Sequence, residues 1–188
     1  MPKCIAQNFA YVCGVAIAWT LLYAINDFFF NFSLYNDAAN LIFLPAMLRP
    51  IAVLLFGPAG VIGLFIGSLI SFNLGPALPP VMFAAAVASA SSGWLAIGLM
   101  RKLPVFSSEL SGELAGFRLS TLVFVCVLTA GFSAFNHQLV YVLTGVTSTP
   151  LAQTIAMFAG DAVGSLIMLY AVASLLRLAR KAVEGSDS

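Results

Sequence analysis

The chain has 188 residues, of which 61% are hydrophobic and only 8% are charged, and its formal net charge is +1. A soluble globular domain carries about 25% charged residues, so this chain lacks the polar side chains that a water-exposed surface needs. The small net charge offers no basic surface to nucleic acid, and we expect no nucleic-acid partner. The composition therefore predicts an integral membrane protein whose main partner is the lipid bilayer.

Six apolar segments follow one another along the chain. They cover residues 5–25, 39–56, 59–74, 79–100, 119–143 and 152–176. A membrane-crossing helix needs about 20 apolar residues, which all but the second and third segments meet comfortably. We therefore predict an all-α, polytopic membrane helical bundle with about six transmembrane helices. A single integral membrane domain would occupy residues 1–181, and a short polar tail at 182–188 would be disordered.

The second and third segments are short and are joined only by "GPAG" at 57–60. Two interpretations remain open for them. We favour two tilted full crossings with a tight turn between them. The alternative is a re-entrant hairpin, which a membrane tolerates only where protein buries it.

The positive charges predict the orientation. Cytoplasmic loops of membrane proteins carry an excess of Lys and Arg. With six crossings and a cytoplasmic N-terminus, every Lys and Arg outside the bilayer falls on the cytoplasmic side, whereas the opposite loops at 26–39, 75–79 and 144–150 contain neither residue. The cytoplasmic set is Lys3, Arg101, Lys102, Arg118, Arg177, Arg180 and Lys181. We expect a multi-pass protein of the bacterial cytoplasmic (inner) membrane with both termini inside.

The parts between the crossings have simple interpretations. The N-terminal segment is too long and too aromatic for a cleaved signal peptide, so we expect a retained membrane helix. The aromatic run "FFFNF" at 28–32 is typical of an anchor at the membrane interface. Glu109 and Glu113, in the linker at 101–118, are four residues apart and indicate one face of a solvated cytoplasmic turn rather than a catalytic pair.

Small residues recur at a spacing of four in two segments. Gly63 and Gly67 do so in the third segment, and Gly160 and Gly164 in the sixth. Small residues at this spacing let helix backbones approach closely in a membrane. We expect these glycines to mediate helix packing within the chain.

Arg49 and Asp161 are the two charges that lie deep within apolar segments. A single charge in hydrocarbon costs several kcal/mol, so such residues usually pair or mark a functional site. If both segments run from the outer to the inner face, each residue lies about ten positions below the outer surface. The similar depth predicts a salt bridge between Arg49 and Asp161.

The role of this pair stays open between two interpretations. It could be a structural link between the second and sixth segments, or part of a ligand site in which Asp161 orients Arg49 toward an anionic ligand. Asn40, Asn136 and His137, the last being the single histidine of the chain, are the other candidates for a ligand-binding or buried polar cluster. His137 is expected either to respond to pH or, more simply, to be hydrogen-bonded near the interface.

Two further features complete the polar inventory. Pro45 and Pro50 are expected to kink the second segment. No nucleophile–base spacing, phosphate-binding loop or metal-ligand cluster is present, so we predict no catalytic site, no metal and no cofactor, and a protein that is not an enzyme. The cysteines are expected to be small apolar packers; they are Cys4, Cys13 and Cys126.

Three stretches resemble the first type of membrane-associated sensor (MASE) domains of bacteria. They are "ANLIFLPAMLRPIAVLLFGPAGVIGLFIGSLI" at 39–70, "FAAAVASASSGWLAIGLMRKL" at 83–103, and "FAGDAVGSLIMLYAVASLL" at 158–176. The resemblance implies a sensor that binds a small ligand or a membrane or cytoplasmic partner protein and takes part in signal transduction. Family members usually have about eight helices and a cytoplasmic output domain. This chain shows about six helices, no such domain after them, and an arginine after "LPAML", so a separate partner would be needed.

A second resemblance is weaker. The size, orientation and small-residue helices are similar to those of the substrate-binding subunits of energy-coupling-factor vitamin importers, although no vitamin-specific motif is present. That resemblance implies transport of a small solute together with a separate coupling subunit. A third interpretation is a membrane enzyme or assembly factor that uses Arg49 and His137.

Overall fold

The computed structural model describes residues 2–36, 39–72, 80–106, 118–146 and 149–186. It is built almost entirely from helices, with one short two-stranded hairpin. In chain order the elements are α1 (Pro2–Phe30), the 3-10 helix η1 (Asn31–Ser33), β1 (Leu34–Asn36), β2 (Ala39–Asn40), the 3-10 helix η2 (Leu44–Met47), α2 (Leu48–Phe56), α3 (Pro58–Ser71), α4 (Pro80–Lys102), α6 (Leu119–Leu143) and α7 (Pro150–Ser186). The predicted all-α class is confirmed.

Glycine and proline mark several of the helix boundaries. Gly57 ends α2 with a φ of 55°, a conformation that glycine adopts readily, and Pro58 begins α3 directly after it. Gly145, with a φ of 70°, ends α6, where the amide of Val146 donates to the carbonyl of Tyr141. The two helices are therefore joined by a tight turn at Gly57, and the rest of "GPAG" forms the first turn of α3.

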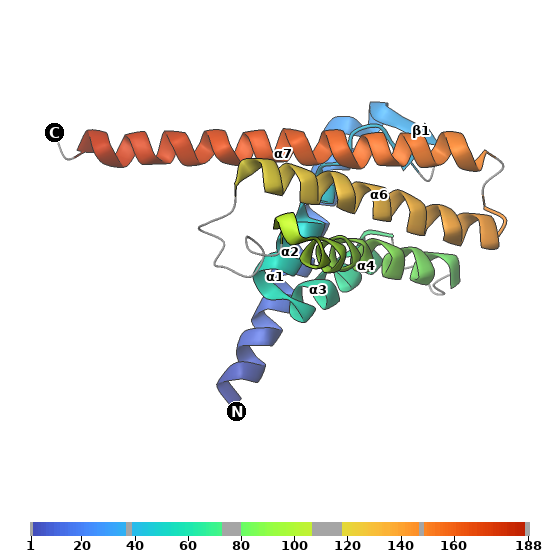
Figure 1. Cartoon of the computed structure of the whole chain (residues 1–188), viewed down its shortest axis with the longest axis horizontal. Coiled ribbons are helices and arrows are strands. Elements are labelled where there is room, and N and C mark those ends of the chain that lie inside the picture. Colours follow the sequence, from blue (N-terminus) through green and yellow to red (C-terminus); the bar gives the residue numbers. More distant parts are fainter. Residues whose placement is uncertain (1, 37–38, 73–79, 107–117, 147–148, 187–188) are drawn as a thin grey trace.

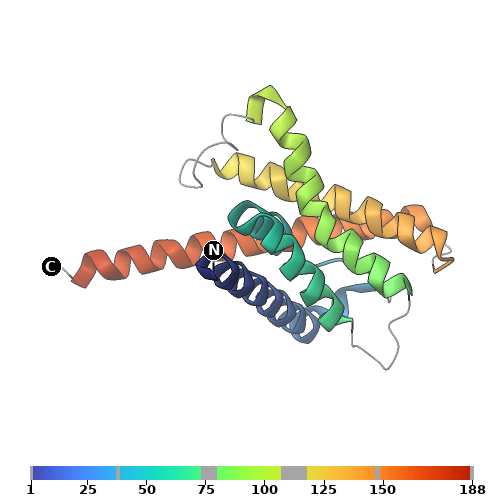
Figure 2. The same cartoon turned by 90° about the horizontal axis from the view of Figure 1, so that it is seen from below.

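The helices form a bundle in which α4, α6 and α7 lie side by side and α1 crosses them obliquely (Figure 1). The closest packing is between α1 and α3, between α4 and α6, and between α6 and α7. Seen from below, α3 lies between α1 and α4, and the red end of α7 extends beyond the bundle (Figure 2). The strands β1 and β2 pair antiparallel, with Leu34 opposite Asn40, and β2 packs against α7.

Four helical stretches of the described residues are long and apolar enough to cross a membrane, at Ile5–Ser33, Pro80–Lys102, Leu119–Leu143 and Pro150–Leu175. The second and third apolar segments, which the sequence already showed to be short, form the helices α2 and α3. α2 has 9 residues and α3 has 14, which at 1.5 Å per residue span about 13 Å and about 21 Å, against about 30 Å of hydrocarbon. The described residues thus contain four helices long enough to cross a membrane and two shorter apolar ones, so the expected count of about six transmembrane helices is not confirmed.

The second segment is not one helix. Its first part, residues 39–43, is extended or irregular, its middle is η2, and only its last part is α2. Pro45 lies in η2 and Pro50 in the first turn of α2, where a missing amide hydrogen is least costly. The segment is therefore interrupted before Arg49, where Pro45 lies, whereas α2 continues through Pro50.

The core contains apolar residues of α1, α2, α3, α4 and α6, among them Trp19, Val53, Leu64, Met100 and Val125. Large apolar side chains also cover the outside, as a lipid-facing surface requires; Phe28 and Phe32 of the predicted interfacial anchor are each 81% exposed. Two further predictions concern the C-terminal tail and the linker at 101–118. α7 runs to Ser186, so it includes most of the polar tail at 182–188; the expected disorder of that tail stays a prediction. Glu109 and Glu113 lie outside the described residues.

Candidate functional site

Arg49 lies in the first turn of α2 and is 4% exposed. Its Nη1 atom is 2.5 Å from Oδ2 of Asp161 on α7, which is also buried. The predicted contact between the two deep charges is therefore confirmed. Because both charges are shielded from solvent, each depends on the other for compensation.

Other contacts fix the guanidinium of Arg49 in one place. Its Nε donates to the hydroxyl of Ser89 on α4 at 3.1 Å, and that hydroxyl is 3.4 Å from the hydroxyl of Ser68 on α3. The guanidinium carbon lies 5.2 Å from the centre of the Trp19 ring and 5.3 Å from that of Phe43. Arg49 is thus connected to α1, α3, α4 and α7 by polar and cation–π contacts.

The glycines of α7 make room for the irregular stretch that precedes Arg49. A Cβ atom on Gly160 would fall within 3 Å of the carbonyl carbon of Asn40, and one on Gly164 would be equally close to the backbone of Phe43. The amide of Phe43 donates to the carbonyl of Gly160 at 3.1 Å. Both glycines therefore mediate the expected close packing, but their partner is extended backbone rather than a helix.

Asn26 of α1 stabilises the same stretch from the other side. It is 3% exposed, and its Oδ1 accepts a hydrogen bond of 2.8 Å from the amide of Leu44 at the start of η2. The amide of Leu41 donates to the carbonyl of Ser33. Irregular backbone is tolerated in a membrane only where its polar groups are satisfied by protein or water, and these bonds meet that condition for Leu41, Phe43 and Leu44.

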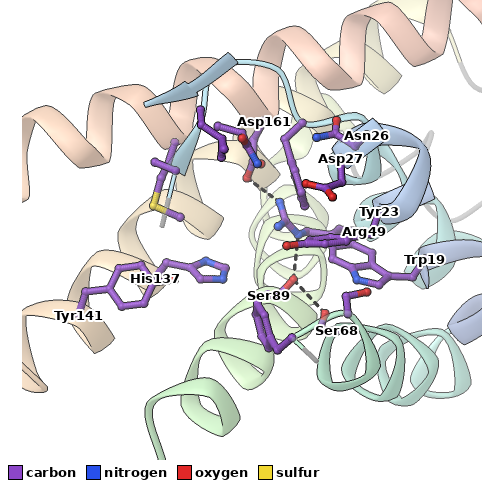
Figure 3. A pocket seen from close by; sticks show the side chains of 17 residues that line it. Trp19, Tyr23, Asn26, Asp27, Arg49, Ser68, Ser89, His137, Tyr141 and Asp161 are labelled. Carbon is purple, nitrogen blue, oxygen red and sulfur yellow. Dashed lines mark hydrogen bonds and ion pairs between the residues drawn. The ribbon is translucent and has the colours of Figure 1, made fainter. Parts of the chain in front are cut away.

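A cavity of about 170 Å³ lies beside the ion pair. Figure 3 shows Asp161 above it, Trp19 and Tyr23 to one side, His137 and Tyr141 to the other, and Ser68 and Ser89 below. The lining residues are Trp19, Tyr23, Asn26, Asp27, Leu34, Ala39, Asn40, Phe43, Arg49, Ser68, Ser71, Phe72, Ser89, His137, Tyr141, Met157 and Asp161. The cavity therefore combines aromatic rings, hydroxyls, amides and one compensated charge pair.

His137 is buried in α6 and points into this cavity (Figure 3). Its Nδ1 lies 2.8 Å from the carbonyl oxygen of Ser133. A carbonyl can only accept, so Nδ1 carries the hydrogen, and Nε2 of the neutral ring is left as an acceptor. His137 is thus the hydrogen-bonded residue that the simpler interpretation expected, although it is buried rather than at the surface.

The candidate residues do not all meet at one place. Arg49, Asp161, His137 and Asn40 line the cavity, whereas Asn136 does not. It lies in a separate groove between α4 and α6, with Ala84, Val87 and Leu139. The grouping of Asn136 with the polar cluster is therefore corrected, because adjacent helical residues point about 100° apart.

Sequence reasoning missed the contribution of α1 to the site. Tyr23, Asn26 and Asp27 all line the cavity. The sequence placed Asn26 and Asp27 in the outer loop at 26–39, where polar residues are ordinary, so they were not counted as candidates for the buried cluster. The one available signal was the spacing of Trp19, Tyr23 and Asn26, which share a helix face.

The residues around the cavity can donate and accept hydrogen bonds and present aromatic rings to a bound molecule. Within the described ranges, no group of three His, Cys, Asp or Glu side chains could bind a metal ion.

Comparisons with protein-family models, with curated proteins and with solved structures found no match. The resemblances to sensor domains and importer subunits therefore remain predictions.

Proposed function

We propose that this protein is a multi-pass sensor of the bacterial cytoplasmic membrane that binds a small ligand in the Arg49–Asp161 cavity and signals to a partner protein. One observation carries the proposal: the buried ion pair lies in the wall of a cavity. A purely structural pair is better served by solid packing, because an empty space next to two charges contributes no compensation.

Unused hydrogen-bonding capacity supports a ligand. Arg49 is bonded through Nε and Nη1, and its Nη2 has no hydrogen-bond partner among the described residues. His137 presents an acceptor at Nε2 on the opposite side. Buried polar groups are normally satisfied, so a bound molecule or water completes this site.

The orientation proposed from the sequence places the cavity toward the outer face. The lining residues come from the later halves of α1, α3 and α6 and from an early turn of α7, which would be the outer ends if Arg101, Lys102 and Arg118 are cytoplasmic. The short α2–α3 hairpin gives the same orientation whether it crosses the membrane twice or re-enters from outside. A ligand would then arrive from the periplasmic side.

A labelling experiment tests this orientation. In a background without native cysteines, Thr144→Cys should react with a membrane-impermeant maleimide in spheroplasts, and Leu103→Cys should react only after permeabilisation. The reverse pattern would contradict the proposal that both termini are inside.

The route of the signal follows from the position of Asp161. It belongs to α7, which has 37 residues, about 55 Å at 1.5 Å per residue, and continues past the apolar span that ends at Leu175. A ligand that changes the contact between Arg49 and Asp161 acts directly on this helix. A partner protein could read such a change at the cytoplasmic end.

The alternative proposal is the substrate-binding subunit of an importer. A cavity that opens toward the outer face would suit an importer subunit as well as a sensor. The two proposals differ in what the ligand does after binding. An importer subunit would accumulate labelled ligand in vesicles when supplied with its coupling proteins, whereas a sensor would bind the ligand without uptake.

Ligand binding itself is tested by purifying the full chain and identifying co-purified small molecules by native mass spectrometry. Met157→Trp should fill the cavity and remove the bound species, since Met157 lines it. Leu166→Trp, on the lipid-exposed side of the same helix, is the matched control and should retain it. If both variants retain the co-purified species, the ligand site is not in this cavity.

A further inference from the structure

The charges around the cavity indicate which class of ligand it would bind, if the proposed ligand-binding function is correct. Three charged side chains line it, from Arg49, Asp161 and Asp27. Arg49 and Asp161 compensate each other at 2.5 Å. Asp27, which is exposed, leaves the lining with one uncompensated negative charge.

Arg49 is poorly placed to attract an anion. Its Nη1 is occupied by Asp161 and its Nε by Ser89. The rings of Trp19 and Phe43 lie close to its guanidinium carbon. An anion approaching the remaining Nη2 edge would come close to the carboxylate of Asp161 in a region of low dielectric, where like charges repel strongly.

The rest of the lining favours a positive charge. Tyr23, Phe72 and Tyr141 present aromatic rings, whose negative faces attract organic cations. His137 faces the same space with an acceptor nitrogen, which suits an N–H donor. The cavity, at about 170 Å³, is smaller than the ~300–1,000 Å³ of most ligand pockets.

From these observations we infer that the cavity binds a small organic cation, with one ring and an ammonium group, in preference to an anion. The ammonium group lies toward Asp27 and the ring among the aromatic side chains. Arg49 and Asp161 then serve as a neutral wall that donates hydrogen bonds through Nη2. Asp27 would select ligands by their charge, and the aromatic rings would select them by their size.

Three probes of matched shape test the inference on the purified full chain: benzylamine, benzyl alcohol and benzoate. Benzylamine should bind about tenfold more tightly than benzyl alcohol in equilibrium dialysis, and benzoate should bind most weakly. Asp27→Asn should lower the affinity for benzylamine to about that for benzyl alcohol. The affinity for benzyl alcohol should not change. Glu184→Gln, which makes the same charge change near the C-terminal end of α7, is the matched control and should leave both affinities unchanged.

The outcomes separate this inference from the proposed function. Benzoate binding as tightly as benzylamine, or a benzylamine preference that survives Asp27→Asn, would overturn the cation class, as would the absence of binding by any probe. Each of these results leaves the effect of Met157→Trp on co-purified molecules as an independent measure of the ligand site. Thermal unfolding of each variant without probe verifies that it is folded.

Discussion

Two glycine pairs with the same spacing make very different contacts in this protein. Gly63 and Gly67 of α3 face the helix α1, where a Cβ atom would meet side-chain and backbone atoms of α1 at 2.7–3.0 Å. Gly160 and Gly164 of α7 face the extended stretch at 39–43, where added Cβ atoms would overlap its carbonyl groups far more severely. The first pair joins two helices, and the second brings irregular backbone against a helix.

The charge between the second pair of glycines explains the difference. Asp161 directly follows Gly160 and reaches Arg49, so the close approach at α7 brings a compensated ion pair and a cavity into the bundle. At Gly63 and Gly67, by contrast, the nearest atoms of α1 are backbone carbonyl oxygens and the side chains of Val15 and Trp19, and no ion pair is formed there. In lipid, where apolar surface alone does not drive helices together, close packing and polar contacts each supply part of the association, and this chain uses them in separate places.

Removing one member of the ion pair should have the largest effect. Arg49→Ala and Asp161→Ala should each reduce the free energy of unfolding by about 3–5 kcal/mol, because the remaining charge is buried without compensation. The double variant should lose less than the sum. Reversible unfolding in detergent by denaturant titration measures all three, and Arg101→Ala, an exposed cation, is the control. Additive losses would show that the two residues do not interact.

Substitution of the packed glycines should have the next largest effect on stability. Gly160→Ala should destabilise the protein by about 2–3 kcal/mol, and Gly63→Ala by about 1 kcal/mol, since overpacking costs rise with the displacement required. Gly98→Ala and Gly131→Ala, where a Cβ atom meets nothing within 4 Å, should be neutral or stabilising within the same helical context. Equal losses at Gly160 and Gly63 would mean that the two contacts are equally adaptable.

The hydrogen bond from the amide of Leu44 to Asn26 is the contact through which α1 stabilises the irregular stretch. Asn26→Leu should cost about 1–3 kcal/mol because it leaves that amide without its acceptor. Asn26→Asp, which retains an oxygen at the same position, should recover part of the loss. The denaturant titration described for the ion-pair variants measures both proteins and the glycine variants. Identical unfolding free energies for Asn26→Leu and Asn26→Asp would show that the hydrogen bond contributes nothing.

Part of this structure could be predicted from the sequence. Mean composition and segment length predict apolar helices, and the scarcity of deep charges predicts that Arg49 meets Asp161. The depth count behind that pairing assumed a continuous helix over 39–56, and the structure replaces its first part with extended residues. The contact forms because the glycines of α7 admit this backbone, which no count of helical turns could reveal.

The aromatic side of the cavity could not be predicted for a related reason. Trp19, Tyr23 and Asn26 lie in α1, more than 20 positions before Arg49 in the chain. Apolar periodicity does not show which helices are neighbours in a membrane. Pro45 correctly indicated that the second segment is interrupted. It did not indicate that the interruption would create a cavity.

The neighbours Asn136 and His137 provide the last and smallest test. Asn136 lies in the groove between α4 and α6, away from the ion pair, so Asn136→Leu should change the free energy of unfolding by no more than about 0.5 kcal/mol and leave the co-purified species bound. His137→Leu removes the acceptor that faces the cavity and should release that species even if the protein remains as stable. The two variants change adjacent residues on one helix, so a difference in binding can only come from the side of α6 that each residue faces. Equal binding in both would place the ligand outside the cavity that Arg49 and Asp161 share.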